Sequence, residues 1–275
     1  MNLTCSPTGL RVLGTEIFDV GGDERPTIVL SDLHVPADGG AVSESLAKVL
    51  DDAAAQRARV LVLGDLFDSY VTKRQLRTGV WQQTAIRFAA AVRAGAAIAV
   101  LHGNRDFLLG SEWTDATGAL VVRGGIRTVL AGQRALLLHG DELCQNDLPY
   151  QRAKRWLRRP LVRAIARRLP LGLALRVAER ARRRSQTVIQ SGDQTRFLPT
   201  SAAVAAAFDT GVEVLVFGHI HRRCAGPFRG GNYWVLPAFD QEGVHLRTGR
   251  GVAFVALDGR PLVEGASPLP GLVGA

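Results

Sequence analysis

The stretch TIVLSDLH, residues 27–34, decides the fold, because a short run of Ile, Val and Leu gives way at once to Ser, Asp and His. Short runs of this composition are typical of strands buried on both faces. Polar residues directly after such a strand lie at its carboxyl end, where loops from neighbouring parallel strands converge on ligands. The stretch therefore predicts a buried strand with a chemically active end.

The same pattern recurs four times along the chain. The later copies are VLVLGDLFD (60–68), IAVLHGNRD (98–106), ALLLHGD (135–141) and VLVFGHIH (214–221). Ala-rich stretches at 43–57 and 81–93 lie between the first three copies and predict helices, with Ser43 as the N-cap of the first. Strands that alternate with helices predict an α/β architecture, and residues 233–261 predict two or three further strands.

Composition sets the broad class of the protein. The 275 residues are 47% hydrophobic and 21% charged, which is typical of a globular protein with one large or two small domains. Three scattered cysteines, Cys5, Cys144 and Cys224, are too few for a disulfide framework and are expected to be reduced thiols. Neither a signal peptide nor an apolar run of about 20 residues is recognisable, so we expect a soluble or peripheral protein.

The net charge of +9 is concentrated in one segment. Residues 152–184 contain thirteen Lys and Arg residues against the single acid Glu179. Apolar residues recur there at every fourth position from Leu157 to Leu169, and Pro170 ends the pattern before a second helix over residues 173–184. This arrangement predicts a basic helical hairpin.

The hairpin divides the chain into three parts. We expect an extension over residues 1–26, a main domain over 27–149 and 186–275, and the inserted hairpin over 150–185. A basic amphipathic helix is typical of a membrane-surface element, so an anionic membrane is the expected partner. A solvated charged helix is the simpler alternative, and nucleic acid is disfavoured because Trp156 is the only aromatic residue interleaved with the basic ones.

The five motifs supply donor atoms suited to a dinuclear metal site. Their seven candidate ligands are Asp32, His34, Asp65, Asn104, His139, His219 and His221. Carboxylates are hard donors, of which Asp65 is the candidate bridge, and imidazoles favour ions such as Mn²⁺, Fe²⁺ or Zn²⁺. Two ions about 3.5–4 Å apart form a known device for cleaving phosphate esters. Asp68 and Asp141 are expected to support the ligands by hydrogen bonding.

On these residues the chain resembles the calcineurin-like metallophosphoesterase superfamily over most of residues 27–221. The resemblance implies a double β-sheet sandwich flanked by helices, here with an inserted helical cap. It also implies how the seven ligands divide. One ion would take Asp32, His34, Asp65 and His221, and the other Asp65, Asn104, His139 and His219.

A narrower resemblance rests on HGNRDFLLG (102–110), HGDELC (139–144) and the residues that follow them. These are similar to the UDP-2,3-diacylglucosamine hydrolases of lipid A biosynthesis. That resemblance implies that Asn104, Arg105 and His219 are catalytic and also bind substrate. It adds Asp147, Tyr150 and Ser185 to the substrate-binding residues. With Ser185 taken as the family's cap serine, the chain departs from the family where an Asn and a Lys would contact substrate, since Ile189 and Gly192 stand there. Candidates to compensate are Gln186, Gln190 and Arg196.

The implied reaction is hydrolysis of the pyrophosphate of UDP-2,3-diacylglucosamine to UMP and 2,3-diacylglucosamine 1-phosphate. Two divalent ions, with Mn²⁺ favoured, are the implied cofactors, and the expected location is the cytoplasmic face of the inner membrane. Two alternatives compete with it. One is a metallophosphodiesterase or pyrophosphatase acting on another nucleotide-linked or nucleic-acid substrate. The other is a non-catalytic scaffold, which would require a missing ligand, and none is missing.

Overall fold

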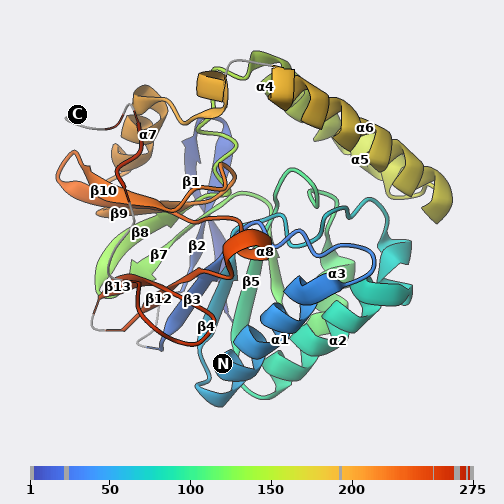
Figure 1. Ribbon diagram of the computed structural model, residues 1–275, viewed down its shortest axis with the longest axis horizontal. Coiled ribbons are helices and arrows are strands. Elements are labelled where there is room, and N and C mark those ends of the chain that lie inside the picture. Colours follow the sequence, from blue (N-terminus) through green and yellow to red (C-terminus); the bar gives the residue numbers. More distant parts are fainter. Residues whose placement is uncertain are drawn as a thin grey trace.

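The computed structural model describes residues 3–21, 25–191, 194–249, 251–262, 267–270 and 272. Within the helix Leu171–Ser191, side chains beyond residue 180 are described only at Arg183. Two mixed sheets pack against each other with helices on the outer sides (Figure 1). This architecture confirms the α/β double-sheet sandwich.

One sheet has six strands in the order β13-β12-β3-β4-β5-β6. Its strands are β3 (Thr27–Leu30), β4 (Arg59–Val62), β5 (Ala97–Leu101), β6 (Leu120–Val122), β12 (His245–Thr248) and β13 (Val252–Val255). The strands from β3 to β6 are parallel, and β12 and β13 extend the sheet in antiparallel fashion. The carboxyl ends of β3, β4 and β5 therefore share one edge.

The other sheet has seven strands in the order β1-β2-β7-β8-β9-β11-β10. They are β1 (Cys5–Val12), β2 (Thr15–Val20), β7 (Gly125–Leu130), β8 (Gln133–Leu137), β9 (Val214–Phe217), β10 (Cys224–Phe228) and β11 (Gly231–Val235). Strands β8 and β9 are parallel neighbours, so their polar motifs also leave the sheet together.

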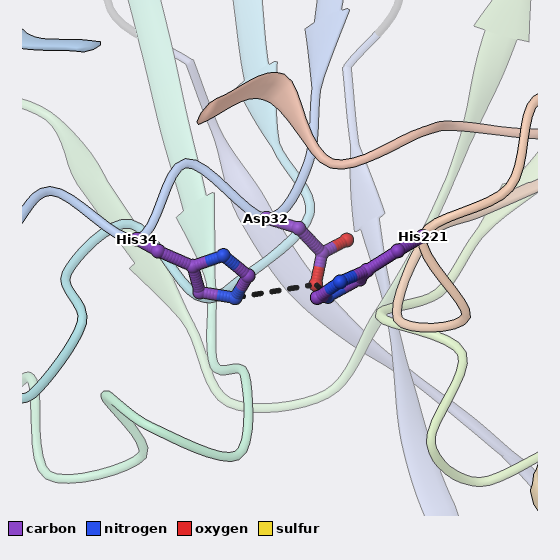
Figure 2. A group of neighbouring side chains, drawn as sticks. All are labelled: Asp32, His34 and His221. Carbon is purple, nitrogen blue, oxygen red and sulfur yellow. Dashed lines mark ion pairs between the residues drawn. The ribbon is translucent and has the colours of Figure 1, made fainter. Parts of the chain in front are cut away.

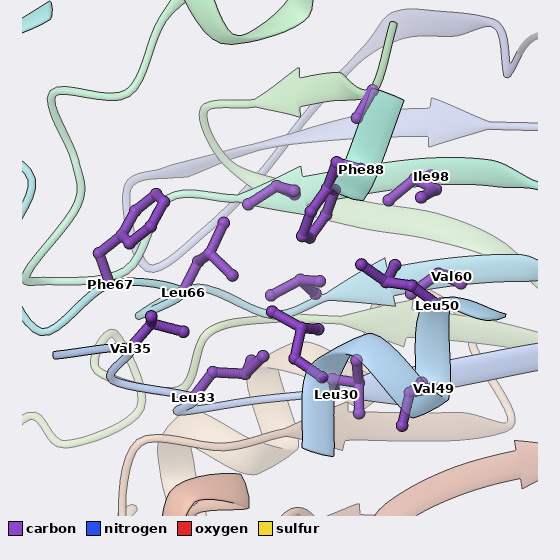
Figure 3. Packing of buried hydrophobic residues seen from close by; sticks show 14 of the residues in the cluster. Leu30, Leu33, Val35, Val49, Leu50, Val60, Leu66, Phe67, Phe88 and Ile98 are labelled. Atoms are coloured by element: carbon purple, nitrogen blue, oxygen red, sulfur yellow. The ribbon is translucent and has the colours of Figure 1, made fainter. Parts of the chain in front are cut away.

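Each central strand is apolar on both faces because each sheet is covered on both sides. Helices α1 (Gly40–Ala55), α2 (Gly79–Arg93) and α3 (Ser111–Thr117) cover the six-stranded sheet, and α7 (Ser201–Phe208) packs on the other. Figure 3 shows Leu30 and Val60 among the side chains beneath these helices, with Phe88 of α2. Val29, the neighbour of Leu30, lies in the cluster between the sheets, as the strand period requires.

No strand was predicted before Thr27, yet the structure has two there. They form the hairpin β1–β2, and β2 pairs in parallel with β7. Most side chains of β1 are exposed, as on many edge strands, so this segment lacks the apolar run that identifies the central strands.

Two local predictions on helices also need correction. Helix α1 begins at Gly40 rather than at Ser43, after Gly39 with its positive φ of 86°, and the Ser43 hydroxyl donates to the Gly39 carbonyl at 2.6 Å. The first arm of the basic hairpin is two helices, α4 (Leu148–Leu157) and α5 (Pro160–Ala166), because Pro160 lacks the N–H that a continuous helix needs. The second arm, α6 (Leu171–Ser191), is longer than predicted.

The remaining short helices lie in connections. They are η1 (Lys73–Arg77), η2 (Gln194–Phe197) and α8 (Phe239–Glu242). Figure 1 shows α4, α5 and α6 as an arm outside the two sheets. Across the part of the chain that is described, no helix combines the length and apolarity needed to cross a membrane.

Candidate metal centre

The five motifs converge where the carboxyl ends of the two sheets meet. Atoms that could bind metal lie within 4.8 Å of one another in two sets. One set is Asp32, His34 and His221, and the other is Asp32, Asp65 and His139. Residues separated by nearly 190 positions thus form one cluster, which the sequence pattern predicted.

In the first set, Asp32 lies between two imidazoles (Figure 2). Its Oδ1 is 3.3 Å from His221 Nε2 and 3.8 Å from His34 Nε2. The side chain is fully buried, and Oδ1 accepts no hydrogen bond from the described residues. A buried carboxylate oxygen without a hydrogen bond is costly. A cation held by these three side chains would remove that cost, so the residues fit a metal ion.

In the second set, Asp65 reaches both halves of the site. Its Oδ2 is 3.3 Å from His34 Nε2, and its Oδ1 is 4.0 Å from His139 Nε2. The Oδ1 atom of Asn104 lies 3.0 Å from the same His139 nitrogen. The His139 Nδ1 faces the carbonyl of Leu63 at 2.8 Å, which fixes the ring and leaves Nε2 toward the centre.

His219 lies on the same side as His139. Its backbone N–H donates to Asp32 Oδ2 at 2.8 Å, and its ring centroid is 5.1 Å from that of His139. Burial, and then the nearby His139, lower the pKa of His219 to about 4, so its imidazole is neutral at pH 7. A neutral imidazole is the form that binds metal.

Five of the seven candidate ligands have left-handed backbone conformations. Their φ angles are +54° at Asp32, +45° at His34, +53° at Asp65, +68° at His219 and +53° at His221. Side chains other than glycine rarely adopt such angles, and they do so mainly where the surrounding structure enforces them at functional sites. The structure around these loops therefore enforces the backbone conformation at five of the candidate ligands.

Glycines next to the ligands allow the loops to touch. A Cβ on Gly103 would lie 2.0 Å from Asp65 Oδ1, and one on Gly218 would lie 1.9 Å from Ser31 Oγ. The glycines of these motifs are thus required by contact between loops, and the sequence motif alone gives no sign of that contact.

The electrostatics of the cluster favour a cation. Burial opposes protonation of His34, but the carboxylates of Asp240 and Asp65 outweigh it and raise the pKa of the imidazole to about 9. Burial also opposes ionisation of Asp32, yet the surrounding histidines hold the pKa of its carboxyl far below the usual range. The carboxylates that favour a proton on His34 would also stabilise a divalent ion there.

Arg105 is fixed at the rim of the cluster. Its Nη1 donates to Asp68 Oδ1 at 2.6 Å, and its Nε lies 3.5 Å from Asp65 Oδ2. The backbone N–H of Arg105 donates to Asp65 Oδ1 at 2.9 Å. Asp68 therefore orients the guanidinium of Arg105, whereas the sequence predicted that it would support a metal ligand by hydrogen bonding.

Asp141 joins the inserted helices to the site. It is 1% exposed, and its Oδ1 accepts a hydrogen bond from Lys154 Nζ at 2.8 Å. The Tyr150 hydroxyl also donates to Asp141, and the Tyr150 ring lies 6.2 Å from that of His219. The first turn of α4 is thereby attached to the loop that carries His139.

The other predicted substrate-binding residues are less directly placed. Asp147 is the N-cap of α4 and accepts a hydrogen bond from the Tyr150 backbone N–H at 3.4 Å. Ser185 is within α6, but its side chain lies outside the described residues, as do those of Gln186, Ile189 and Gln190, and Gly192 is not described at all.

Sequence reasoning missed Asp240 of α8. Its Oδ2 lies 3.2 Å from His34 Nδ1, on the opposite side of the ring from Asp65. A carboxylate in this position orients a metal-binding histidine. Because Asp240 is 206 residues from His34 and belongs to no motif, the sequence carried no local signal for this contact.

Comparison with known proteins gives a family match over most of the chain. Residues 25–223 match the sequence profile of the calcineurin-like phosphoesterases. A Ralstonia nicotianae protein named UDP-2,3-diacylglucosamine hydrolase is 31% identical over 225 residues, which cover 78% of this chain and 84% of that protein. A Pseudomonas putida protein of the same name is 33% identical over 197 residues, which cover 71% and 81%.

The solved structures that the comparison finds are more distant in sequence. A predicted phosphoesterase from Streptococcus pneumoniae TIGR4 is 15% identical with a TM-score of 0.40, covering 91% of this chain and 96% of its own. Zinc-bound Vps29 from Entamoeba histolytica is 15% identical with a TM-score of 0.43, covering 87% and 94%.

Proposed function

Because this chain belongs to the calcineurin-like phosphoesterase family and is a hydrolase, we propose that it cleaves the pyrophosphate bond of UDP-2,3-diacylglucosamine. The products are UMP and 2,3-diacylglucosamine 1-phosphate. The observation that carries the proposal is the similarity, over most of both chains, to relatives named for this activity.

Two divalent ions, with Mn²⁺ favoured, are the proposed cofactors. One is assigned to Asp32, His34, Asp65 and His221, and the other to Asp65, Asn104, His139 and His219. The position of Asp65 between His34 and His139 supports its role as the shared ligand. When bound, such ions supply Lewis acidity toward phosphoryl oxygens and lower the pKa of the attacking water.

The chain's own residues supply orientation and charge. Arg105, held by Asp68, can donate to a pyrophosphate oxygen and offset the negative charge that develops in the transition state. A phosphate leaving group needs little protonation, so no imidazole acid is required at that position. The Tyr150 ring beside His219 supports a role in substrate binding for Tyr150 and for Asp147 in the same turn. Ser185 keeps that role as a proposal from sequence alone.

The inserted helices are the proposed contact with the lipid and with an anionic membrane surface. They expose apolar side chains among their arginines, including Leu161 at 72%, Ile165 at 57% and Trp156 at 56%. Acidic headgroups contribute about 1 kcal/mol for each nearby Lys or Arg. We propose that the enzyme works at the cytoplasmic face of the inner membrane, where it takes up a lipid-bearing nucleotide.

The test is to incubate the purified protein with Mn²⁺ and UDP-2,3-diacylglucosamine, and to identify the products by mass spectrometry. UDP-N-acetylglucosamine, which has the diphosphate but no acyl chains, is the substrate control, and Asp65→Ala is the protein control. We expect UMP from the lipid substrate with the wild-type protein only. If a simple phosphodiester is cleaved but the lipid substrate is not, the substrate assignment is wrong and the family chemistry stands.

A further inference from the structure

The short helix α8 holds Asp240 beside the candidate metal centre. The backbone N–H of Phe239 donates to the carbonyls of Ser31 and Asp32 at 3.2 and 3.1 Å. The Phe239 side chain is 2% exposed and packs in the same core cluster as Leu30 of β3. Asp240 is the next residue in the chain, so its backbone is fixed relative to the loop that carries Asp32.

The Asp240 carboxylate faces the outer nitrogen of the His34 ring. Its Oδ2 lies 3.2 Å from His34 Nδ1, and His34 is the only hydrogen-bond or ion-pair partner of Asp240 among the described residues. The opposite nitrogen, Nε2, is directed at Asp32 (Figure 2) and also lies 3.3 Å from Asp65 Oδ2. The hydrogen bond at one ring nitrogen of a histidine determines which nitrogen binds metal. Asp240 therefore selects Nε2 as the metal-binding atom.

His139, in the other half of the site, has an uncharged partner at the same ring position. Its Nδ1 faces the Leu63 carbonyl at 2.8 Å. A carbonyl fixes the orientation of the ring, whereas a carboxylate also makes the imidazole a stronger base and places a negative charge near the ion. The assigned ligands differ in the same direction, since one half has the carboxylate of Asp32 where the other has the neutral amide of Asn104. The His34 half is thus the more negative of the two.

We propose that Asp240 is a positioning residue that acts through His34 and makes the two ion positions unequal, so that the ion on the His34 side binds more tightly. This role rests on the two-ion centre of the proposed function, and it specifies which ion the protein retains when metal is scarce. Loss of a carboxylate behind a metal-binding histidine typically weakens metal binding about 10- to 100-fold. The Asp240 side chain is 28% exposed, so water screens its charge, and the lower end of that range is expected.

The test is equilibrium dialysis of the full-length protein against Mn²⁺, with the bound ions counted by elemental analysis. Wild type should bind two ions with unequal affinities. Asp240→Ala should weaken the tighter ion about tenfold and leave the weaker ion within about twofold. Asp240→Asn keeps an oxygen that accepts from His34 Nδ1–H but loses the charge, so its affinity should lie between those of wild type and Asp240→Ala. Thermal melts of the metal-free proteins establish that each variant is folded.

Glu242→Gln is the matched control. It removes one negative charge from the same short helix, and the Glu242 carboxylate lies 4.0 Å from Arg223 Nε rather than beside a candidate ligand. Its binding of both ions should equal that of wild type.

A double-mutant cycle tests whether Asp240 acts through His34. Asp240→Ala should have no further effect on metal binding in a His34→Ala protein, and in a His139→Ala protein it should weaken the remaining ion about tenfold. Equal weakening of both ions, an equal effect of Glu242→Gln, or an undiminished effect in His34→Ala would overturn the role of Asp240. Wild-type protein that binds one ion or none would refute the two-ion centre itself, and the role of Asp240 with it.

Discussion

Replacing Gly218 by alanine should inactivate the protein although Gly218 is not itself a ligand. The added Cβ would lie 1.9 Å from Ser31 Oγ and 2.4 Å from Asp32 Oδ2. The φ angle at Gly218 is not among the positive ones, so alanine brings no conformational strain of its own. The effect would come from the contact alone.

The size of the effect follows from that contact. Real Cβ atoms essentially never approach another heavy atom within 3.0 Å, so the loop must move by about 1 Å to clear Ser31 Oγ and by about 0.6 Å to clear Asp32 Oδ2. Metal–ligand distances tolerate only about ±0.2 Å. A misplacement of about 1 Å in an active site can cost about 100-fold in rate. We therefore expect activity at least about 100-fold lower, together with loss of bound metal.

The assay compares hydrolysis of a chromogenic phosphodiester in Mn²⁺ with metal content after gel filtration. Gly249→Ala is the control, since a Cβ there would meet nothing within 4 Å. If Gly218→Ala retained both metal and activity within about twofold of the control, the close packing of this loop on Asp32 would be refuted.

Three other perturbations have defined outcomes. Asp65→Ala should abolish activity and reduce bound Mn²⁺, whereas Arg105→Ala should keep the metal and lower kcat about 100-fold. Metal analysis and steady-state kinetics measure the two effects. Equal loss of metal in both variants would contradict the roles assigned to Asp65 and Arg105. Lys154→Met should lower the free energy of unfolding in urea by about 3 kcal/mol, because it removes the nearer of the two cations beside buried Asp141 and leaves only Arg158 at 3.9 Å. Lys154→Arg should restore most of that loss. Burial and the nearby Arg247 lower the pKa of His245 from 6.5 to about 4 in the folded protein. The unfolded chain therefore takes up the proton at a higher pH than the folded protein does, so the free energy of unfolding falls as pH drops from 6.5 toward 4. Wild type should lose about 2 kcal/mol more than His245→Gln between pH 7.5 and pH 5, and identical losses would exclude this residue as the cause.

The sequence predicted the features that are encoded locally. A central strand such as β3 has a compact apolar run, and the residues that follow it must emerge at the sheet edge, so the sequence alone places Asp32 and His34 there. The family resemblance then implied the second sheet and how the ligands divide.

Features that depend on distant contacts could not be predicted in this way. Asp240 contacts His34 only because β12 and β3 pair and bring α8 to the site. The hairpin β1–β2 was not predicted because a strand at the edge of a sheet needs no apolar run. The signal for the break at Pro160, by contrast, was present in the sequence, but the four-residue spacing of apolar residues from Leu157 to Leu169 indicated one continuous helix.

The left-handed backbone at five ligand positions has a consequence for evolution. Each such residue costs roughly 1–2 kcal/mol relative to a glycine, so the catalytic loops reduce the stability of the protein that carries them. Selection for hydrolysis maintains that strain. In a descendant relieved of this selection, glycine at Asp32, His34, Asp65, His219 or His221 would relieve that strain as it removed a candidate ligand. Substitutions that remove the candidate metal centre would then also lower the conformational cost of the loops, and the loops of such a descendant would be rich in glycine.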